Sequence, residues 1–218
     1  MTTPFDDGDD VADEQAATPP PPTLTDEVRL LMQEYEVTIV NIVATFDLGL
    51  KIDLKDLVMN ARNVEYNPRK FGGAIMRLRN PKTTAIVFGT GKVVLVGLND
   101  IDGADFAAQR VETIVRKIGY TDATAKHVTV RNITATANAA HRVRLEGLLL
   151  EHARFCSFEP ELFPGLYYRM IGPKMCFTIF TSGKVIVCGA KSLVDVGNGF
   201  AKLMPVLHQF QMRSRNII

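Results

Sequence analysis

The chain has few of the residues on which catalytic, metal-binding or secreted proteins depend. Only three of its 218 residues are cysteine, and none belongs to a C-x-x-C pair that would suit zinc or redox chemistry. Three are also too few for a disulfide framework, so a reducing compartment is expected. The histidines are scattered without metal-ligand spacing, at His127, His141, His152 and His208. We therefore predict a protein that is not an enzyme and has no metal or cofactor.

Long apolar runs and a strong net charge are absent as well. No stretch approaches the roughly eighteen apolar residues that a membrane helix needs, and no charged-then-apolar leader opens the chain. The sequence thus predicts a soluble, intracellular protein without a membrane partner. Lysine and arginine number 25 against 24 acidic residues, a balance that by itself argues weakly against nucleic-acid binding.

Acidic residues are concentrated at the start of the chain. Residues 1–23 contain six of them, no lysine or arginine, and the proline run 19–22. Such a composition is typical of a disordered tail with a stiff end, and we assign residues 1–24 to it. The remainder is moderately basic. With 46% apolar residues in the sequence, it can bury one good core or two small ones.

An internal repeat organises this remainder, because residues 37–97 align with residues 128–189. The matched segments are V-T-I-V-N-I-V (37–43) with V-T-V-R-N-I-T (128–134), N-P-R-K-F (67–71) with E-P-E-L-F (159–163), and F-G-T-G-K (88–92) with F-T-S-G-K (180–184). Two copies are fewer than a solenoid needs to bury a continuous core. We therefore predict a pseudo-symmetric duplication, with one copy over residues 35–120 and the other over residues 125–210.

Each copy alternates between strand-like and helix-like patterns. Helical segments are predicted at 47–60 and at about 142–153, each followed by strands that a glycine-containing loop joins into a hairpin. An amphipathic helix closes the first copy at about 104–118, and a helix at 193–210 closes the second. The fold class is therefore α+β, with strands in an antiparallel sheet and helices packed on one face.

The two closing helices are expected to differ in regularity. The apolar stripe of the first is predicted to consist of Phe106, Val111, Ile114, Val115 and Ile118. The second is expected to be weakened by two glycines and bent by a proline, at Gly197, Gly199 and Pro205.

The hairpin strands are apolar on both faces, although a sheet covered on one side should alternate apolar and polar residues. This holds for the segments 85–88, 93–96 and 185–188. One explanation is a second layer of helices. The other is an apolar surface left open for a ligand.

Four phenylalanines stand at matched turn positions, mostly beside a lysine: Phe71, Phe88, Phe163 and Phe180. A phenylalanine at a strand end usually belongs to the core. Four at matched turns suggest instead apolar wedges that enter base steps of DNA, with a cation ready for the adjacent phosphate.

Two asparagines occupy matched strand positions. Alternation places Asn41 on the face of Val37, Ile39 and Val43, and Asn132 is its counterpart in the second copy. Amides at both positions suggest donors for adenine N3 and thymine O2, the acceptors that an A·T pair shows in the minor groove.

The segments A-R-N-V-E-Y-N-P-R-K-F (61–71) and E-P-E-L-F-P-G-L (159–166), together with the two F-x-x-G-K hairpins, resemble the TATA-box-binding protein family. The resemblance covers about residues 35–210. It implies a pseudo-two-fold saddle of about ten antiparallel strands with helices on the convex face. It also implies a nuclear general transcription factor that binds and bends promoter DNA as a monomer and nucleates pre-initiation complex assembly. Kinking of the minor groove is a known property of this family.

The resemblance implies residue roles as well. The four phenylalanines would intercalate. Base contacts would come from Asn41, Asn132, Val43, Thr134, Ile86, Val94, Val96, Thr178, Ile186 and Cys188. Phosphates would be bound by Arg69, Lys70, Arg77, Lys92, Arg169, Lys174, Lys184 and Lys191. Transcription factor IIB would contact Glu159 and Glu161, and factors like transcription factor IIA and TBP-associated factors are further expected partners.

Some positions depart from the family pattern. Val96 and Cys188 replace threonines, Thr134 and Thr178 replace aliphatic residues, and the segment 97–99 has one cation fewer. The alternative is therefore a related factor with altered or lost TATA specificity that acts as a protein-interaction scaffold. The altered threonines and a less basic first closing helix favour this alternative, and the four phenylalanines argue against it.

Cys176 and Cys188 are predicted to be neighbours across the second hairpin. A three-residue loop at 181–183 brings them opposite each other, on the face of Thr178 and Phe180. They could simply be two small apolar thiols that fill the DNA-binding surface, or a pair whose oxidation stiffens the hairpin.

Overall fold

The computed structural model describes residues 25–212; the predicted acidic tail lies outside them. In chain order the helices are α1 (Asp26–Glu34), α2 (Leu54–Asn60), α3 (Asp102–Lys117), α4 (Leu145–Glu151) and α5 (Leu193–Gln209). The strands are β1 (Thr38–Asp47), β2 (Val64–Glu65), β3 (Gly73–Arg79), β4 (Lys82–Phe88), β5 (Lys92–Leu98), β6 (Lys126–Asn138), β7 (Cys156–Ser157), β8 (Gly165–Met170), β9 (Met175–Phe180) and β10 (Lys184–Ala190).

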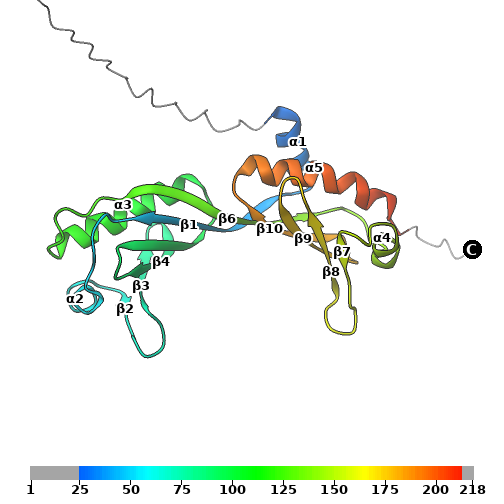
Figure 1. Cartoon of the computed structure of the whole chain (residues 1–218). Coiled ribbons are helices and arrows are strands. Elements are labelled where there is room, and N and C mark those ends of the chain that lie inside the picture. Colours follow the sequence, from blue (N-terminus) through cyan, green and yellow to red (C-terminus); the bar gives the residue numbers. More distant parts are fainter. Residues whose placement is uncertain (1–24, 213–218) are drawn as a thin grey trace, which may run out of the picture.

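All ten strands form one antiparallel sheet, in the order β2-β3-β4-β5-β1-β6-β10-β9-β8-β7. Strands β1 to β5 come from the first sequence copy and β6 to β10 from the second, with β1 and β6 paired at the centre. Equivalent strands of the two copies follow one another in the same order from each edge to the centre. In Figure 1 the sheet arches over, and the β2–β3 and β7–β8 loops hang down at its two ends. The predicted α+β saddle of about ten strands is confirmed.

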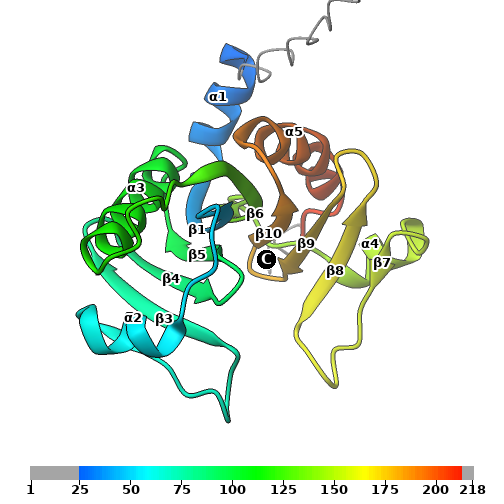
Figure 2. The same cartoon turned by 60° about the vertical axis from the view of Figure 1, so that its left-hand side comes forward.

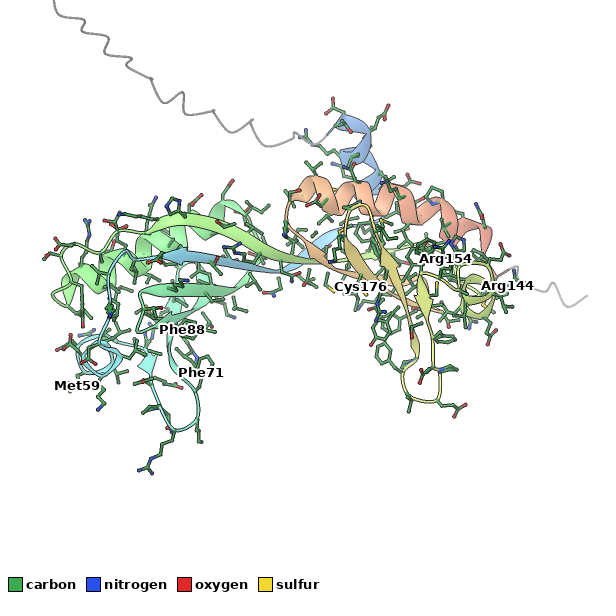
Figure 3. All side chains as sticks on the ribbon, in the orientation of Figure 1. Met59, Phe71, Phe88, Arg144, Arg154 and Cys176 are labelled. Carbon is green, nitrogen blue, oxygen red and sulfur yellow. The ribbon has the colours of Figure 1, made fainter. Side chains whose placement is uncertain are left out.

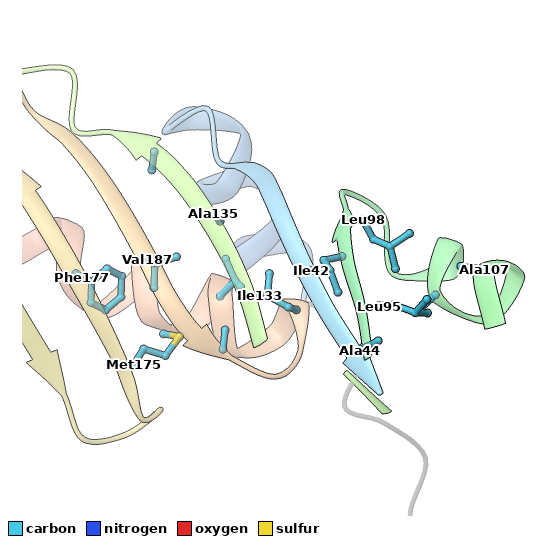
Figure 4. Packing of buried hydrophobic residues seen from close by; sticks show 14 of the residues in the cluster. Ile42, Ala44, Leu95, Leu98, Ala107, Ile133, Ala135, Met175, Phe177 and Val187 are labelled. Carbon is cyan, nitrogen blue, oxygen red and sulfur yellow. The ribbon is translucent and has the colours of Figure 1, made fainter. Parts of the chain in front are cut away.

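The helices cover one face of the sheet. α3 and α5 lie along the convex side of the two halves, while α2 and α4 stand at the outer ends (Figures 1 and 2). The core lies between these helices and the sheet, and it contains Ile42 and Leu95 from one half and Ile133, Phe177 and Val187 from the other (Figure 4). Full burial of such a side chain contributes about 1.5–3 kcal/mol. Within residues 25–212 no second helical layer covers the other face, so that explanation for the apolar strands is wrong.

The two short helices are shorter than predicted. α2 begins at Leu54 rather than near Asp47, because β1 continues to Asp47 and Gly49 then turns the chain with a φ of +79°. Asp53 caps the helix, and its Oδ1 accepts hydrogen bonds from the amides of Lys55 at 2.8 Å and Asp56 at 3.4 Å. α4 spans Leu145–Glu151 rather than 142–153.

α3 presents alanine and valine to the sheet. Its buried residues are Ala104, Ala107, Ala108, Val111 and Val115. Phe106 was predicted on this stripe and is 50% exposed, because it lies two residues, about 200° of helical rotation, from Ala104 and from Ala108. Ile114 and Ile118 pack against the core and are partly buried, as the stripe predicts.

α5 runs unbroken through Gly197 and Gly199 and contains Pro205. A Cβ on Gly197 would stand 2.1 Å from Val28 of α1, and one on Gly199 would stand 2.0 Å from Met175 of β9. The glycines therefore allow close packing on both sides of the helix. α1 lies against α5 in Figure 2, and the sequence prediction did not include it.

Candidate nucleic-acid interface

The face opposite the helices, here called the open face, carries partly exposed side chains from every long strand. Cα partners in an antiparallel ladder point to the same side, so the pairings identify its members. Val43 pairs with Val96 on one neighbour and with Asn132 on the other. Across the central strands of the sheet the members are Thr38, Asn41, Val43, Thr45, Thr84, Ile86, Phe88, Val94, Val96, Thr129, Asn132, Thr134, Thr136, Cys176, Thr178, Phe180, Ile186 and Cys188.

This face explains why the strands are apolar on both sides. In β4, Thr83, Ala85 and Val87 are buried beneath the helices, whereas Ile86 and Phe88 remain partly exposed on the open face. The same alternation recurs in β5, β9 and β10. A broad apolar surface is thus left uncovered within residues 25–212, and every residue predicted to contact bases lies on it.

The two asparagines have equivalent hydrogen bonds. Asn41 Oδ1 accepts a bond from the Gly97 amide at 2.9 Å, and Asn132 Oδ1 accepts one from the Gly189 amide at 2.7 Å. Each carbonyl oxygen is thus engaged by the sheet. Asn132 Nδ2 donates one of its two hydrogens to Thr134 Oγ1 at 3.3 Å. Its second hydrogen and the Nδ2 group of Asn41 are left to donate to a ligand. The open face therefore has two oriented amide donors near its centre.

A β-bulge corrects the predicted face of the residues before Asn41. Ile39 pairs with Ala135 but Asn41 pairs with Thr134, so two residues of β1 advance against one of β6. Ile39 consequently shares the side of buried Ala135 and packs against the core, as Val37 does. The prediction that Val37 and Ile39 lie on the face of Asn41 is wrong, whereas Val43 does lie there.

The four phenylalanines form two matched pairs at the ends of the open face. The ring centroids of Phe71 and Phe88 are 6.0 Å apart at an interplanar angle of 65°, and those of Phe163 and Phe180 are 6.0 Å apart at 64°. Phe71 is 44% exposed and Phe163 is 36% exposed. Figure 3 shows Phe71 and Phe88 together beneath the first half of the sheet. Each half thus presents an edge-to-face aromatic pair to solvent.

Glycines make room for these pairs. A Cβ on Gly73 would come within 2.9 Å of the Phe71 ring, and one on Gly165 within 2.6 Å of the Phe163 ring. The glycine of each F-x-x-G-K hairpin is also required by its backbone. Gly91 and Gly183 have φ of +91° and +95°, and an added Cβ would stand 2.0 Å from Leu50 O and 2.2 Å from His141 O.

The predicted phosphate-binding cations lie around the open face. Lys92 and Lys184 begin β5 and β10 next to Phe88 and Phe180, and both are exposed. The others, also exposed, are Arg69 and Lys70 in the β2–β3 loop, Arg77 in β3, Arg169 in β8, Lys174 in the β8–β9 turn, and Lys191 after β10. Arg77 forms an ion pair with Glu65, whereas its counterpart Arg169 has Ser157 at the equivalent place and no ion pair among the described residues.

The β2–β3 and β7–β8 loops share a fold but differ in charge. In each loop the amide of the phenylalanine donates to the carbonyl four residues earlier, Phe71 to Asn67 and Phe163 to Glu159, at 3.0 Å in both. The first loop carries Arg69 and Lys70. The second carries Glu159 and Glu161, both exposed. One loop therefore suits an anionic backbone and the other suits a basic partner.

Sequence reasoning missed several residues of the open face. Thr45 and Thr136 continue the alternation that begins at Asn41 and Asn132, and Thr84 begins it in β4, so a strict period of two would have found them. Ile75 and Tyr167 are matched residues of the outer strands, and Tyr167 stacks on Phe163 at 5.4 Å.

Cys176 and Cys188 are Cα partners in the β9–β10 ladder, as predicted, and both are free. Burial raises the pKa of the Cys176 thiol, the nearby Cys188 raises it further, and Arg169 opposes the rise. With Arg169 and Lys174 they line a hollow of about 580 Å³ on the second half. Burial also raises the pKa of Cys156 to about 11.

Two kinds of site are not found in the described residues. No three histidine, cysteine, aspartate or glutamate side chains gather there to ligate a metal ion. No helix among residues 25–212 is both long and apolar enough to cross a bilayer.

Comparison with known proteins identifies the family. A family model described as transcription factor TFIID (or TATA-binding protein, TBP) matches residues 36–118 and 127–210. TATA-box-binding protein 1 of Arabidopsis thaliana is 45% identical over 174 residues, which cover 80% of this chain and 86% of that one. The Saccharomyces cerevisiae TATA-box-binding protein is 44% identical over 174 residues, covering 80% and 72%. The solved structure of Methanococcus jannaschii TBP superposes with a TM-score of 0.68 at 31% identity, over 79% of this chain and 98% of that one. The chain belongs to the TATA-binding protein family.

Proposed function

We propose that this protein binds A·T-rich double-stranded promoter DNA in the minor groove, bends it, and nucleates assembly of the transcription pre-initiation complex. One observation carries the proposal: two equivalent phenylalanine pairs stand at opposite ends of an uncovered apolar face. An apolar wedge at each end can unstack a base step, and two wedges produce two kinks. The protein acts as a monomer on DNA and carries out no chemical reaction.

The centre of the open face fits the groove between the kinks. Asn41 and Asn132 direct Nδ2 donors outward, where adenine N3 and thymine O2 would accept them. Around the amides, Val43, Val94 and Ile186 are apolar, which suits the sugar and base edges of a widened minor groove. The surrounding lysines and arginines would bind phosphates and release counterions.

Protein partners and localisation complete the proposal. Glu159 and Glu161 stand exposed at the tip of a loop that is otherwise built like its cationic counterpart, so we assign them to a factor like transcription factor IIB. Factors like transcription factor IIA and TBP-associated factors would dock elsewhere on the saddle. Such a role places the protein in the nucleus.

A gel-shift titration tests the central claim. The full chain is titrated against a TATA-containing duplex and a scrambled duplex of equal composition, and energy transfer between dyes on the duplex ends reports bending. We expect at least about tenfold tighter binding to the TATA duplex, because each mismatched base pair costs about 1–3 kcal/mol. Equal affinities with no bend would contradict the proposal and favour the alternative of a protein-interaction scaffold.

A further inference from the structure

Two free thiols stand next to each other on the open face of the second half. Cys176 of β9 and Cys188 of β10 are Cα partners, and partners in an antiparallel ladder point to the same side of the sheet. Cys188 is exposed and Cys176 is half-buried. Figure 3 shows Cys176 in the second half of the sheet. The pair is therefore open to a small solute.

The charges around the two thiols are positive. Arg169 is the Cα partner of Cys176 in the β8–β9 ladder, so its side chain leaves the sheet beside that thiol. Arg169 and Lys174 line the same hollow of about 580 Å³ as the two cysteines, and within residues 25–212 no acidic residue lines it. Since Arg169 forms no ion pair among the described residues, its charge is available to an anionic group at the thiols.

The first half lacks both features. Thr84 and Val96 are the matched Cα partners there, so no thiol is present at that place. Arg77 is the counterpart of Arg169, and its guanidinium is ion-paired with Glu65. The paired thiols and a cation without an acidic partner thus occur together only in the second half of the described chain.

The spacing of the two cysteines suits a single ion held between their sulfurs. Opposite Cα atoms of an antiparallel pair lie about 4.5–5.5 Å apart. Two metal–thiolate bonds of about 2.3 Å, placed end to end, span about 4.6 Å. Side chains that leave the sheet in parallel can therefore bring their sulfurs to opposite sides of one ion without a shift of the backbone.

The two thiols also select the kind of ion. Thiolates favour soft cations such as Cu(I), whereas Mg²⁺ and Ca²⁺ take oxygen ligands. Zn²⁺ requires about four ligands, and within residues 25–212 no three histidine, cysteine, aspartate or glutamate side chains gather to supply them. Cu(I), in contrast, is satisfied by two thiolates on opposite sides of the ion.

We propose that Cys176 and Cys188 form a binding site for Cu(I) on the second half of the saddle. Each thiol releases its proton to solvent and forms one S–Cu bond, so two protons leave for each ion bound and no electron is transferred. Two thiolates and one Cu(I) together carry a single negative charge, which Arg169 and Lys174 offset. The site goes beyond the proposed function, because it forms without DNA.

A competition titration tests the site in the reduced full chain, under anaerobic conditions and without DNA. Cu(I) is supplied as its coloured complex with bicinchoninate, and the loss of colour reports transfer of the ion to the protein. We expect each chain to take up one Cu(I), with thiolate-to-copper absorption in the ultraviolet and release of two protons. Because the assay contains no DNA, its failure would leave the proposed function intact.

Three variants identify the ligands. Cys188→Thr changes an exposed side chain and leaves the core intact, and it should weaken Cu(I) binding by more than about a hundredfold, since even loss of a residue that only contacts a ligand costs about 10–100-fold. Arg169→Gln should weaken binding about tenfold. Cys156→Ser removes the third thiol, on β7, and should bind as wild type does. Absence of uptake by wild type, or equal affinity of wild type and Cys188→Thr, would overturn the inference.

Discussion

At the scale of single residues, small side chains decide where large ones can stand. Gly73 and Gly165 lie under the rings of Phe71 and Phe163, and a methyl group at either place would collide with the ring above it. The rings can therefore lean on Phe88 and Phe180 in the edge-to-face geometry that stabilises aromatic pairs by about 0.5–1.5 kcal/mol. If these rings act as wedges, they would already be ordered before they met a base step.

Replacing Phe180 with alanine tests whether the ring acts on DNA rather than on the fold. The ring is only partly buried, so the free energy of unfolding should fall by about 1–2 kcal/mol, less than the 3–5 expected for a core phenylalanine. DNA bending, measured by energy transfer between duplex ends, should fall by far more. Phe106→Ala removes an exposed ring from convex α3 and serves as the matched control. An unchanged bend angle in Phe180→Ala would show that the ring is no wedge.

The thiols of Cys176 and Cys188 form a second pair of neighbouring side chains. A diamide oxidant would take two electrons and two protons from them and leave one disulfide across the hairpin, because Cα partners lie within bonding range. We expect the disulfide to stiffen the second half and to weaken DNA binding. The thiolate is the reactive form, and burial raises the pKa of Cys176, so oxidation should accelerate as the pH rises.

Binding titrations with and without diamide check this expectation in wild type and in Cys188→Ser. Wild type should lose affinity after oxidation and recover it with a reducing agent, whereas the variant should be indifferent. Cys156 is present in both proteins and controls for oxidation elsewhere. Equal sensitivity of the two proteins would exclude the cross-strand pair.

At the scale of the element, strand-like runs joined by glycine-containing loops predicted the hairpin strands, and a period of two placed most of their side chains on the correct face. The cysteine register followed from the loop length alone, because a three-residue loop fixes every pair behind it. The pattern failed at the bulges of β1 and β6, since one extra residue reverses the alternation and leaves no mark in composition. The helical pattern failed also at Phe106. The face of α3 that packs on the sheet carries small alanines, and the large ring of Phe106 lies on another face of the helix.

Other elements were beyond the reach of local pattern. α1 carries a cap signal in Thr25 with Asp26 and Glu27 in its first turn, but its place on α5 depends on a glycine far away in the chain. The placement of Arg131 on the open face likewise needs the neighbouring strand, because Thr45 holds it there. The pairing of strands from the two copies is part of the tertiary structure, and the sequence of a single segment does not specify it.

The β7–β8 loop should bind protein rather than DNA. Two carboxylates near a phosphate backbone would be repelled, so Glu159 and Glu161 must point away from it. Charge reversal of both to lysine should leave the dissociation constant for the TATA duplex within about twofold, as exposed charges contribute little. Formation of a ternary complex with transcription factor IIB, followed by gel shift, should fall steeply.

The matched control is Glu27→Lys with Glu34→Lys, which makes the same change in charge on exposed α1. That variant should assemble the ternary complex as wild type does. Undiminished assembly by the loop variant would remove both glutamates from the partner site.

At the scale of the whole molecule, duplication gives two halves that share nearly every backbone feature and differ in side-chain chemistry. The strand order, the aromatic pairs, the amide bonds to glycine and the left-handed hairpin glycines all recur. The first loop is cationic and the second acidic. Repetition thus fixes the shape of the saddle, while the differences in side-chain chemistry distinguish its two ends.

The strand order also affects the tendency of the protein to aggregate. An open sheet with an uncovered apolar face is at risk of growing from molecule to molecule, because unpaired edges can template another chain. Here the outermost strands, β2 and β7, are each only two residues long. Each edge strand therefore offers few free backbone N–H and C=O groups, too few for a second copy to add a strand. We expect the protein to resist aggregation through its edges even while the face that its function needs stays bare.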